Sequence, residues 1–263
     1  MIRVAILGAS GFVGGELLRL CAMHPQLRPA RAFGDTQAGS ALAGAHPHLA
    51  LAYPDLVVER FEPAALDGID LVFAALPHGH SQAIAPEILG RDIAFVDLGA
   101  DFRLRDPAEY QRWYGERHAA PELLPRFVYG IPELNRSAIQ ASRAVAAAGC
   151  YPTAAILALK PLVDAGLVDP GSIVVDASSG VSGAGRAAKE ATAFNTVSES
   201  LAAYGLVSHR HTAEMEASLG AQVLFTSIDP IEVAERMLAL GIENPLHLVE
   251  AARQWGVVEV KQG

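Results

Sequence analysis

The sequence predicts an α/β protein with an N-terminal Rossmann-type, doubly wound parallel sheet. Short apolar runs without polar alternation recur along the first hundred residues, as expected for strands that are buried on both faces. Helical patterns follow several of these runs, and repeated strand–helix units build a parallel sheet. Glycine is plentiful, at 24 of 263 residues, which suits the tight turns of such a fold.

The composition is that of a globular protein and argues against several partners. The chain is 51% apolar and 19% charged, and it is long enough for one large domain or two smaller ones. The net charge of -9 disfavours a nucleic-acid partner. We find no apolar run long enough to span a bilayer and no cleavable leader, so we expect a cytoplasmic protein without a membrane partner. The distant Cys21 and Cys150 are expected to be free thiols.

The first strand is expected over residues 2–7 (IRVAIL), followed by GASGFVG and a helical pattern. This order predicts a dinucleotide site, because glycines let the backbone approach a pyrophosphate and a helix N-terminus supplies N–H groups. The alternative is an ordinary glycine turn. Cys21 lies on the apolar face of this helix and is expected to be a small buried residue. The candidate cofactor-binding residues are Gly8, Ser10, Gly11, Phe12, Val13 and Gly14.

A second strand is expected over residues 28–33, and the turn GDTQAG follows it. Dinucleotide-binding folds recognise the adenosine ribose near this point. Asp35 could accept hydrogen bonds from the ribose hydroxyls and favour NAD, whereas Thr36, Gln37 and Arg31 could bind the 2′-phosphate of NADP. A plain polar turn is the third alternative, and the sequence leaves all three open.

Two further buried strands are expected, over residues 69–76 and 93–99, and each ends in polar residues. Ligands of doubly wound folds bind at the carboxyl ends of the strands, so Pro77 is a candidate contact of the cofactor. His78 and His80 are consistent with a functional role or with a simple loop.

The second of these strands leads into ADFRL, which places Asp101 and Arg103 at a strand end. A charged pair at this edge favours a binding site. An exposed ion pair is the alternative.

Cys150 lies in the segment AAAGCYPT, just before a helical pattern over residues 153–165. Pro152 suits a helix start and Gly166 suits a helix end. Cys150 is therefore expected at or just before a helix N-terminus, where the helix dipole favours a thiolate. This placement favours a nucleophile over a buried filler.

A strand is expected over residues 173–177, and SSGVSGAGR follows it. Small residues with exposed backbone N–H groups and a terminal arginine are typical of an anion-binding nest, although a flexible glycine loop is the alternative. The candidates for binding phosphate or carboxylate are Ser179, Ser182, Gly183 and Arg186.

His209 and His211 are two residues apart, so on a strand they would point the same way. A cysteine with a distant histidine is a nucleophile–base arrangement. We find no metal-binding spacing in the sequence and expect no metal.

Taken in order, these segments resemble the N-acetyl-γ-glutamyl-phosphate reductases of arginine biosynthesis. The resemblance rests on GASGFVGGEL, ALPHG, DLGADFRL, YGIPELNR, GCYPTAAILALKP, SGVSGAGR and HRHTAEME, and it runs from residue 1 to about 226. The GCYPT and HRHT segments are its specific parts. Aspartate-semialdehyde dehydrogenase is a more distant relative with the same combination of cysteine, histidine and arginine.

The resemblance implies an NADPH-dependent reductive dephosphorylation of an acyl phosphate, with NAD still possible as the cofactor. Cys150 would form a thioester, His209 would be the favoured acid/base, and His211 would orient or bind the substrate. Arg103 is similar in placement to a phosphate-binding arginine of the aspartate relative. Pro77, Ser182 and Gly183 are further candidates for cofactor binding, and Ser179 and Arg186 are candidates for substrate or phosphate binding.

Two other functions stay open. One is a nucleotide-binding or inactive homologue, and the other is a reductase for an aminoadipate or aspartate acyl phosphate. The sequence departs from the family at Ala148, where proline is usual, and at GDTQAG, which lacks the usual serine/arginine pair. The NADP preference is therefore implied only by the resemblance.

The resemblance also predicts three regions: an NAD(P)-binding domain over 1–148, a catalytic/substrate domain over 149–226, and an unrecognised tail over 227–263. The second is expected to be an α+β substrate and dimerisation domain that looks incomplete beside the family. The tail is expected to hold helices over 231–240 and 245–254 and a final short strand. A homo-oligomer is expected, weakened because the family's C-terminal segment is not recognisable.

Overall fold

The structure is a computed structural model that describes residues 1–198, 200, 202, 204 and 209–226. It divides into two compact units. The first comprises Met1–Gly149 and Ala184–Ala187, and the second comprises Cys150–Gly183 and the described residues after Ala187. The tail expected over 227–263 lies outside the described residues, and the domain boundaries at 148 and 226 stay predictions.

The first unit is built on one seven-stranded sheet. Its strands are β1 Ile2–Leu7, β2 Leu27–Phe33, β3 Val58–Glu59, β4 Leu71–Ala74, β5 Ala94–Asp97, β6 Val128–Gly130 and β7 Ala144–Ala147. They lie in the order β3-β2-β1-β4-β5-β7-β6, and every neighbouring pair is parallel. The chain thus winds outward from β1 in both directions, which confirms the predicted doubly wound sheet.

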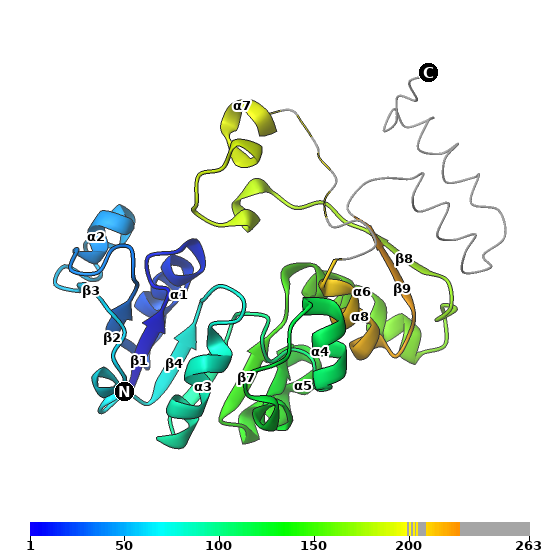
Figure 1. Cartoon of the computed structure of the whole chain (residues 1–263), viewed down its shortest axis with the longest axis horizontal. Helices are drawn as coiled ribbons and strands as arrows, with labels where there is room; N and C mark the ends of the chain where they lie inside the picture. The colour runs from blue at the N-terminus through cyan, green and yellow to red at the C-terminus, as the bar shows by residue number, and fades with distance from the viewer. Residues whose placement is uncertain (199, 201, 203, 205–208, 227–263) are drawn as a thin grey trace. The chain divides into compact units, whose positions relative to one another are not determined.

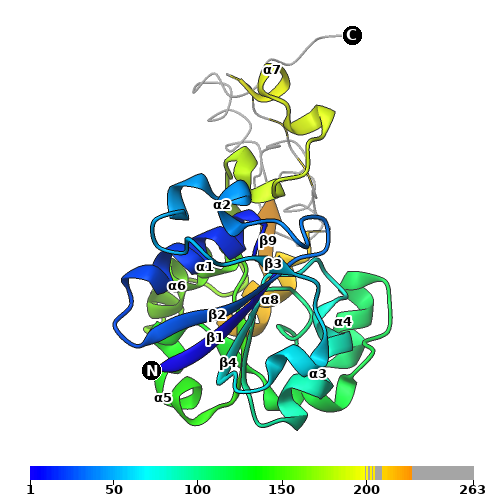
Figure 2. The same cartoon turned by 90° about the vertical axis from the view of Figure 1, so that its left-hand side faces the viewer.

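Helices cover both faces of this sheet. Its helices are α1 Phe12–Met23, α2 Leu42–Ala45, α3 Ser81–Gly90, α4 Pro107–Tyr114 and α5 Pro132–Ala141. Figures 1 and 2 show α1 on one face of the sheet and α3 with α4 on the other.

Strand β1 shows why the apolar runs lack polar alternation. Val4 and Ile6 pack on the face of the sheet that α1 covers, with Leu18. The residues between and after them, Ala5 and Leu7, pack on the face that α3 covers. Because successive side chains of a strand point to opposite faces, a strand with two covered faces must be apolar throughout. Each fully buried aliphatic side chain stabilises the fold by about 1.5–3 kcal/mol.

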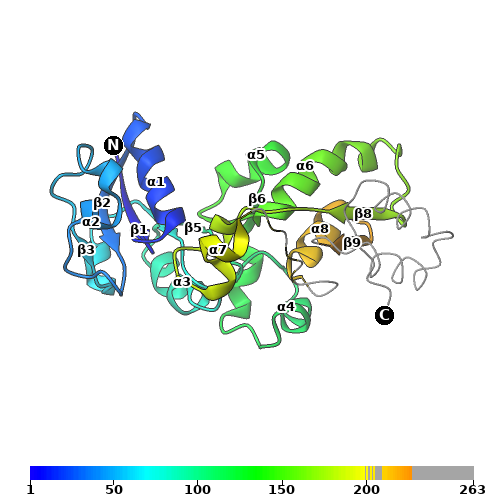
Figure 3. The same ribbon diagram turned by 90° about the horizontal axis from the view of Figure 1, so that it is seen from above.

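The second unit contains a two-stranded parallel sheet of β8 Ile173–Asp176 and β9 Val223–Thr226. Its described helices are α6 Cys150–Asp164, α7 Phe194–Val197 and α8 His211–Leu219. Figure 3 shows α6 and α8 next to each other, with β8 and β9 beside them. The predicted helix after Cys150 and the strand near residues 173–177 are both confirmed.

Candidate functional site

The loop between β1 and α1 has two positions that accept only glycine. Gly8 has φ +77°, and a Cβ there would lie 2.2 Å from the carbonyl oxygen of Ala75, just after β4. A Cβ at Gly14 would lie 2.3 Å from the carbonyl oxygen of Gly8. The backbone of the loop therefore packs directly against the next strand and the start of the helix.

The first turn of α1 is open to an anion. Gly11 precedes the helix, and the next residues, Phe12 and Val13, are about half exposed. No acidic side chain lies in this turn. The N–H groups of the turn, with the positive end of the helix dipole, fit the phosphates of a dinucleotide. Ser10 lies within the loop, and the exposed Pro77 follows β4, whose carboxyl end lies beside that of β1.

The candidate contacts of the ribose, near the turn after β2, differ in their exposure and in their partners. Asp35 and Thr36 are exposed, and Gln37 is partly buried. Arg31 instead donates to both carboxylate oxygens of Glu59, each 3.0 Å away. The negative charge of Glu59 opposes a 2′-phosphate at Arg31.

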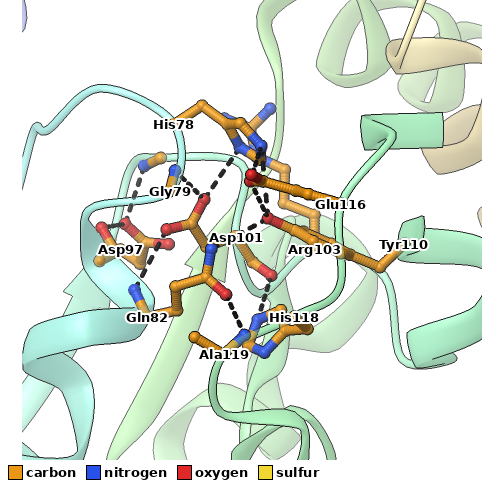
Figure 4. Close-up of polar contacts among 12 residues, drawn as sticks. His78, Gly79, Gln82, Asp97, Asp101, Arg103, Tyr110, Glu116, His118 and Ala119 are labelled. Atoms are coloured by element: carbon orange, nitrogen blue, oxygen red, sulfur yellow. Dashed lines mark hydrogen bonds and ion pairs between the residues drawn. The ribbon is translucent and has the colours of Figure 1, made fainter.

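Asp101 lies at the centre of a polar cluster at the carboxyl ends of β4 and β5 (Figure 4). Its carboxylate is fully buried and accepts hydrogen bonds from the backbone N–H groups of Gly79, at 2.8 Å, and Gln82, at 3.1 Å. It thus satisfies N–H groups at the start of α3. The Nδ1 atom of His78 lies 3.0 Å from the same carboxylate. Asp101 is therefore a buried helix cap, and the alternative of an exposed ion pair is wrong.

Residues 110–118 complete this cluster. The Nε2 atom of His78 lies 3.1 Å from a carboxylate oxygen of Glu116, and its ring stacks on Tyr114 at 4.4 Å between centroids. His118 donates from Nε2 to the backbone carbonyl of Asp101 at 2.9 Å, and burial lowers the pKa of His118. Of the two histidines in PHGHS, His78 lies within the cluster and His80 is exposed.

Arg103 and Asp97 flank the cluster. Arg103 donates from Nη2 to the carbonyl of Leu98 at 3.0 Å. Asp97 is fully buried and accepts from Ser81 Oγ at 2.6 Å and from Gly99 N–H at 2.9 Å. Burial raises the pKa of Asp97 to about 6, in spite of these hydrogen bonds.

Cys150 is the first residue of α6 and its side chain is exposed. The prediction that it lies at a helix N-terminus is confirmed, as is the helix end at Gly166, which has φ +65°. Cys21 is buried in α1, as expected, and both thiols are free. An exposed thiol at the positive end of a helix has the placement of a nucleophile, and a buried one does not.

His211 is the first residue of α8 and His209 lies two residues before it, so the two histidines lie at a helix start and not on a strand. Their rings are nevertheless close, with centroids 4.5 Å apart. The Nδ1 atom of His209 accepts the backbone N–H of His211 at 3.1 Å, which places the proton of a neutral His209 ring on Nε2. Burial, and then the charge of Arg210, lowers the pKa of His209. The Nε2 atom of His211 lies 3.9 Å from the buried carboxylate of Glu214.

Two tyrosines connect Cys150 to the histidines within this unit. Tyr151 is buried, and its ring centroid lies 5.7 Å from that of His209 and 5.8 Å from that of His211. Tyr204 donates to the Tyr151 hydroxyl at 2.9 Å. Burial and this hydrogen bond raise the pKa of Tyr204, and the negative charge of Cys150 raises it further. Cys150 is thus within electrostatic reach of Tyr204.

The residues of SSGVSGAGR belong to different units. Ser179, Ser182 and Gly183 are exposed residues of the second unit. Arg186 belongs to the first unit, where it donates to the backbone carbonyl of Ala45 at 3.1 Å. Its guanidinium lies 5.0 Å from the ring centroid of Phe12, in the first turn of α1.

Two models of protein-family domains match this chain, one in its N-terminal half and one after it. Residues 3–142 match the model described as semialdehyde dehydrogenase, NAD binding domain, which is more than half of the chain. The chain belongs to the semialdehyde dehydrogenase family. Residues 150–230 match the dimerisation domain of the same family.

The chain is also similar to curated N-acetyl-gamma-glutamyl-phosphate reductases. It is 49% identical over 221 residues to that of Desulforudis audaxviator and 47% identical over 219 residues to that of Ectopseudomonas mendocina. These alignments cover 84% and 83% of this chain and 64% of each relative. The chain thus spans less than two thirds of the length of the relatives that it matches.

Solved structures support the fold. Aspartate semialdehyde dehydrogenase with NADP from Candida albicans matches with a TM-score of 0.61 at 14% identity, over 87% of this chain and 69% of that one. The Vibrio cholerae aspartate semialdehyde dehydrogenase II complexed with ASA matches with a TM-score of 0.58 at 17% identity, over 86% and 69%. Within the described part of the chain, no helix has the length and apolar character needed to cross a membrane.

The sequence did not predict some residues of the candidate site. Tyr151 directly follows Cys150, so its position was a usable signal. Tyr204 forms its hydrogen bond with the distant Tyr151, and His46 contacts the distant Arg186, so no local pattern marks them.

Proposed function

We propose that this protein reduces N-acetyl-γ-glutamyl phosphate to N-acetylglutamate semialdehyde, with NADPH, in arginine biosynthesis. The main observation that supports this proposal is the exposed Cys150 at the start of α6, with His209 and His211 in the same unit. The names of the curated relatives support the choice of substrate.

The first step uses Cys150 as a nucleophile. The N-terminus of α6 favours the thiolate, whose sulfur attacks the acyl carbon of the substrate. A carbon–sulfur bond forms, the bond from carbon to the phosphate oxygen breaks, and inorganic phosphate leaves with the electron pair. Arg103 and Ser179 are the proposed contacts of the phosphoryl group.

The second step reduces the thioester. A bound nicotinamide cofactor would supply the hydride that reduces the thioester carbon. His209 donates a hydrogen bond from Nε2 to the oxygen that becomes negative, because its Nδ1 is already an acceptor. Protonated His211, with Glu214 nearby, gives a proton to this oxygen. When the carbon–sulfur bond breaks, His211 takes the proton back, the aldehyde leaves and the thiolate is restored. This assignment makes His211 the acid/base, in place of the family-based preference for His209.

The residues of the glycine loop fit a dinucleotide. The backbone cradle at Gly8 and Gly14, which a Cβ would fill, and the first turn of α1 would hold its phosphates. Gly11, Pro77, Ser182 and the neighbouring loop residues are proposed contacts of the same cofactor. The preference for NADP over NAD is part of the proposal, and the NADP complex of the Candida albicans structure supports it.

The dimerisation domain match supports a homo-oligomer, and we place the enzyme in the cytoplasm as part of the same proposal.

The test is oxidation of N-acetylglutamate semialdehyde by the purified chain. We expect reduction of NADP that requires inorganic phosphate and exceeds the rate with NAD. Absence of turnover by a folded protein that binds NADPH would instead support a nucleotide-binding homologue. Faster turnover of an aminoadipate or aspartate semialdehyde would assign the other substrate class.

A further inference from the structure

A buried histidine lies against the dinucleotide loop. The ring of His46 follows α2 and is 3% exposed. It occupies the space that a side chain at Gly15 would need, since a Cβ there would lie 2.4 Å from its Cε1 atom. A titratable ring buried against a cofactor loop requires defined partners for both nitrogens.

The two partners of His46 define its tautomer. Its Nε2 atom lies 2.9 Å from the backbone carbonyl of Ala9, which can only accept, so Nε2 carries the proton. Its Nδ1 atom lies 3.3 Å from Nη2 of Arg186, which can only donate, so Nδ1 accepts. Burial lowers the pKa of His46, and the charges of Arg186 and His48 lower it further, against the effect of the Ala9 contact. The ring is therefore neutral at pH 7.

The guanidinium of Arg186 is oriented from three sides. It donates to Ala45 and to His46, and it lies over the ring of Phe12. These contacts use two of its five N–H donors, and the others remain for an anion. Phe12 begins α1, so the charge of Arg186 lies beside the helix N-terminus of the glycine loop.

We propose that His46 is a positioning residue of the dinucleotide site, which holds Arg186 at the start of α1 so that its guanidinium binds the cofactor's phosphates. The proposal rests on dinucleotide binding as part of the proposed function. It reassigns Arg186 from the acyl phosphate to the cofactor. It also explains why a buried neutral imidazole connects the carbonyl of Ala9 to an arginine 140 residues further along the chain.

The test is NADPH binding to the full chain, followed by the fluorescence of the reduced nicotinamide. We expect Arg186→Ala to weaken binding roughly tenfold and His46→Ala roughly fivefold, through loss of a charge-assisted contact. His46→Asn, which can keep an acceptor near the Nδ1 position, should recover part of the loss. His48→Ala removes an exposed imidazole of the same turn and serves as the control, with binding unchanged.

A double variant separates positioning from general destabilisation. If His46 acts through Arg186, His46→Ala should have little further effect in the Arg186→Ala background.

In the wild type, NADPH binding should weaken as the pH falls below 6.5, because a protonated His46 cannot accept a hydrogen bond from Arg186. The His46→Asn variant should lack this pH response. The groups that face the ring are Arg186 and His48, so His48→Ala tests the other source of a pH effect.

Three outcomes would overturn the proposal: unchanged NADPH binding in Arg186→Ala, additive losses in the double variant, or a loss confined to the KM for the acyl phosphate. Failure of the wild type to bind any dinucleotide would instead contradict the proposed function. Circular dichroism and thermal unfolding of each variant identify any that has lost its fold.

Discussion

The chemistry of single side chains in this protein depends on their immediate partners. Cys150 is exposed at a helix start, whereas Cys21 is buried in α1. His209 is held as an Nε2–H tautomer by the backbone N–H of His211. Asp97 and Asp101 are both fully buried, but only Asp101 has a histidine in ion-pair distance. The environment therefore assigns different roles to residues of one type.

Cys150→Ser should lower turnover by about a thousandfold or more and leave NADPH binding nearly unchanged, because the nucleophile is lost and the glycine loop is untouched. The measurements are the phosphate-dependent semialdehyde assay and a fluorescence titration. Cys21→Ala is the matched control and should retain activity. Substantial turnover by Cys150→Ser would rule out the nucleophile.

Asp97→Asn should change how stability depends on pH. The pKa of Asp97 is raised to about 6 from an ordinary value of 3.8, so the folded state holds the proton more tightly than the unfolded state. The contribution of this group is thus most favourable below pH 3.8 and is lost as the pH rises through 6. Between pH 5 and 7.5 the wild type should lose on the order of 1–2 kcal/mol relative to the variant. Urea unfolding at both pH values measures this difference, and parallel pH dependences would contradict it.

At the scale of elements, the strand ends bring the functional loops together. β1, β4 and β5 are adjacent and parallel, so their following loops lie at one edge of the sheet. Asp101, after β5, caps the start of α3, which follows β4. The loops that carry Pro77 and Arg103 are therefore held to each other by a buried carboxylate.

Gly14→Ala and Gly90→Ala should have opposite effects, although both glycines are helical. The Cβ of the first would meet the backbone of Gly8 and Ala9, whereas the Cβ of the second meets no atom within 4 Å. We expect Gly14→Ala to destabilise the fold by about 1–3 kcal/mol and to weaken NADPH binding. Gly90→Ala should be neutral or stabilise by up to about 1 kcal/mol, since alanine favours the helix. Thermal unfolding compares them, and equal effects would contradict the close packing of the glycine loop.

At the scale of the whole molecule, the chain has two units, and both large apolar clusters of the first lie within residues 1–149. The seven-stranded sheet lies entirely in the same range. Only 184–187 joins this unit from further along the chain. The first unit thus has the core of an independent domain.

Residues 1–149 expressed alone should fold cooperatively, because no strand of the sheet and no member of either apolar cluster is removed. NADPH binding should be retained but weaker than in the full chain, by about the loss expected for Arg186→Ala. Thermal unfolding by circular dichroism and the same fluorescence titration measure both. A fragment without a cooperative transition, or with full affinity, would contradict this prediction.

The sequence alone determined the elements and the chemistry that depend on local order. Apolar runs located the strands, and the order strand, glycine loop, helix located the dinucleotide site, because both follow from neighbouring residues. The helix start at Cys150 followed from Pro152 and the apolar pattern after it.

Only the tertiary structure decided which distant groups meet. It brought Arg186 into contact with His46 and Tyr204 into contact with Tyr151. It also placed the carboxylate of Asp101 within hydrogen-bond distance of the backbone at the start of α3. It also showed that the two histidines lie at a helix start, where their rings come together. These contacts depend on how the elements pack, and no short-range pattern in the chain records that packing.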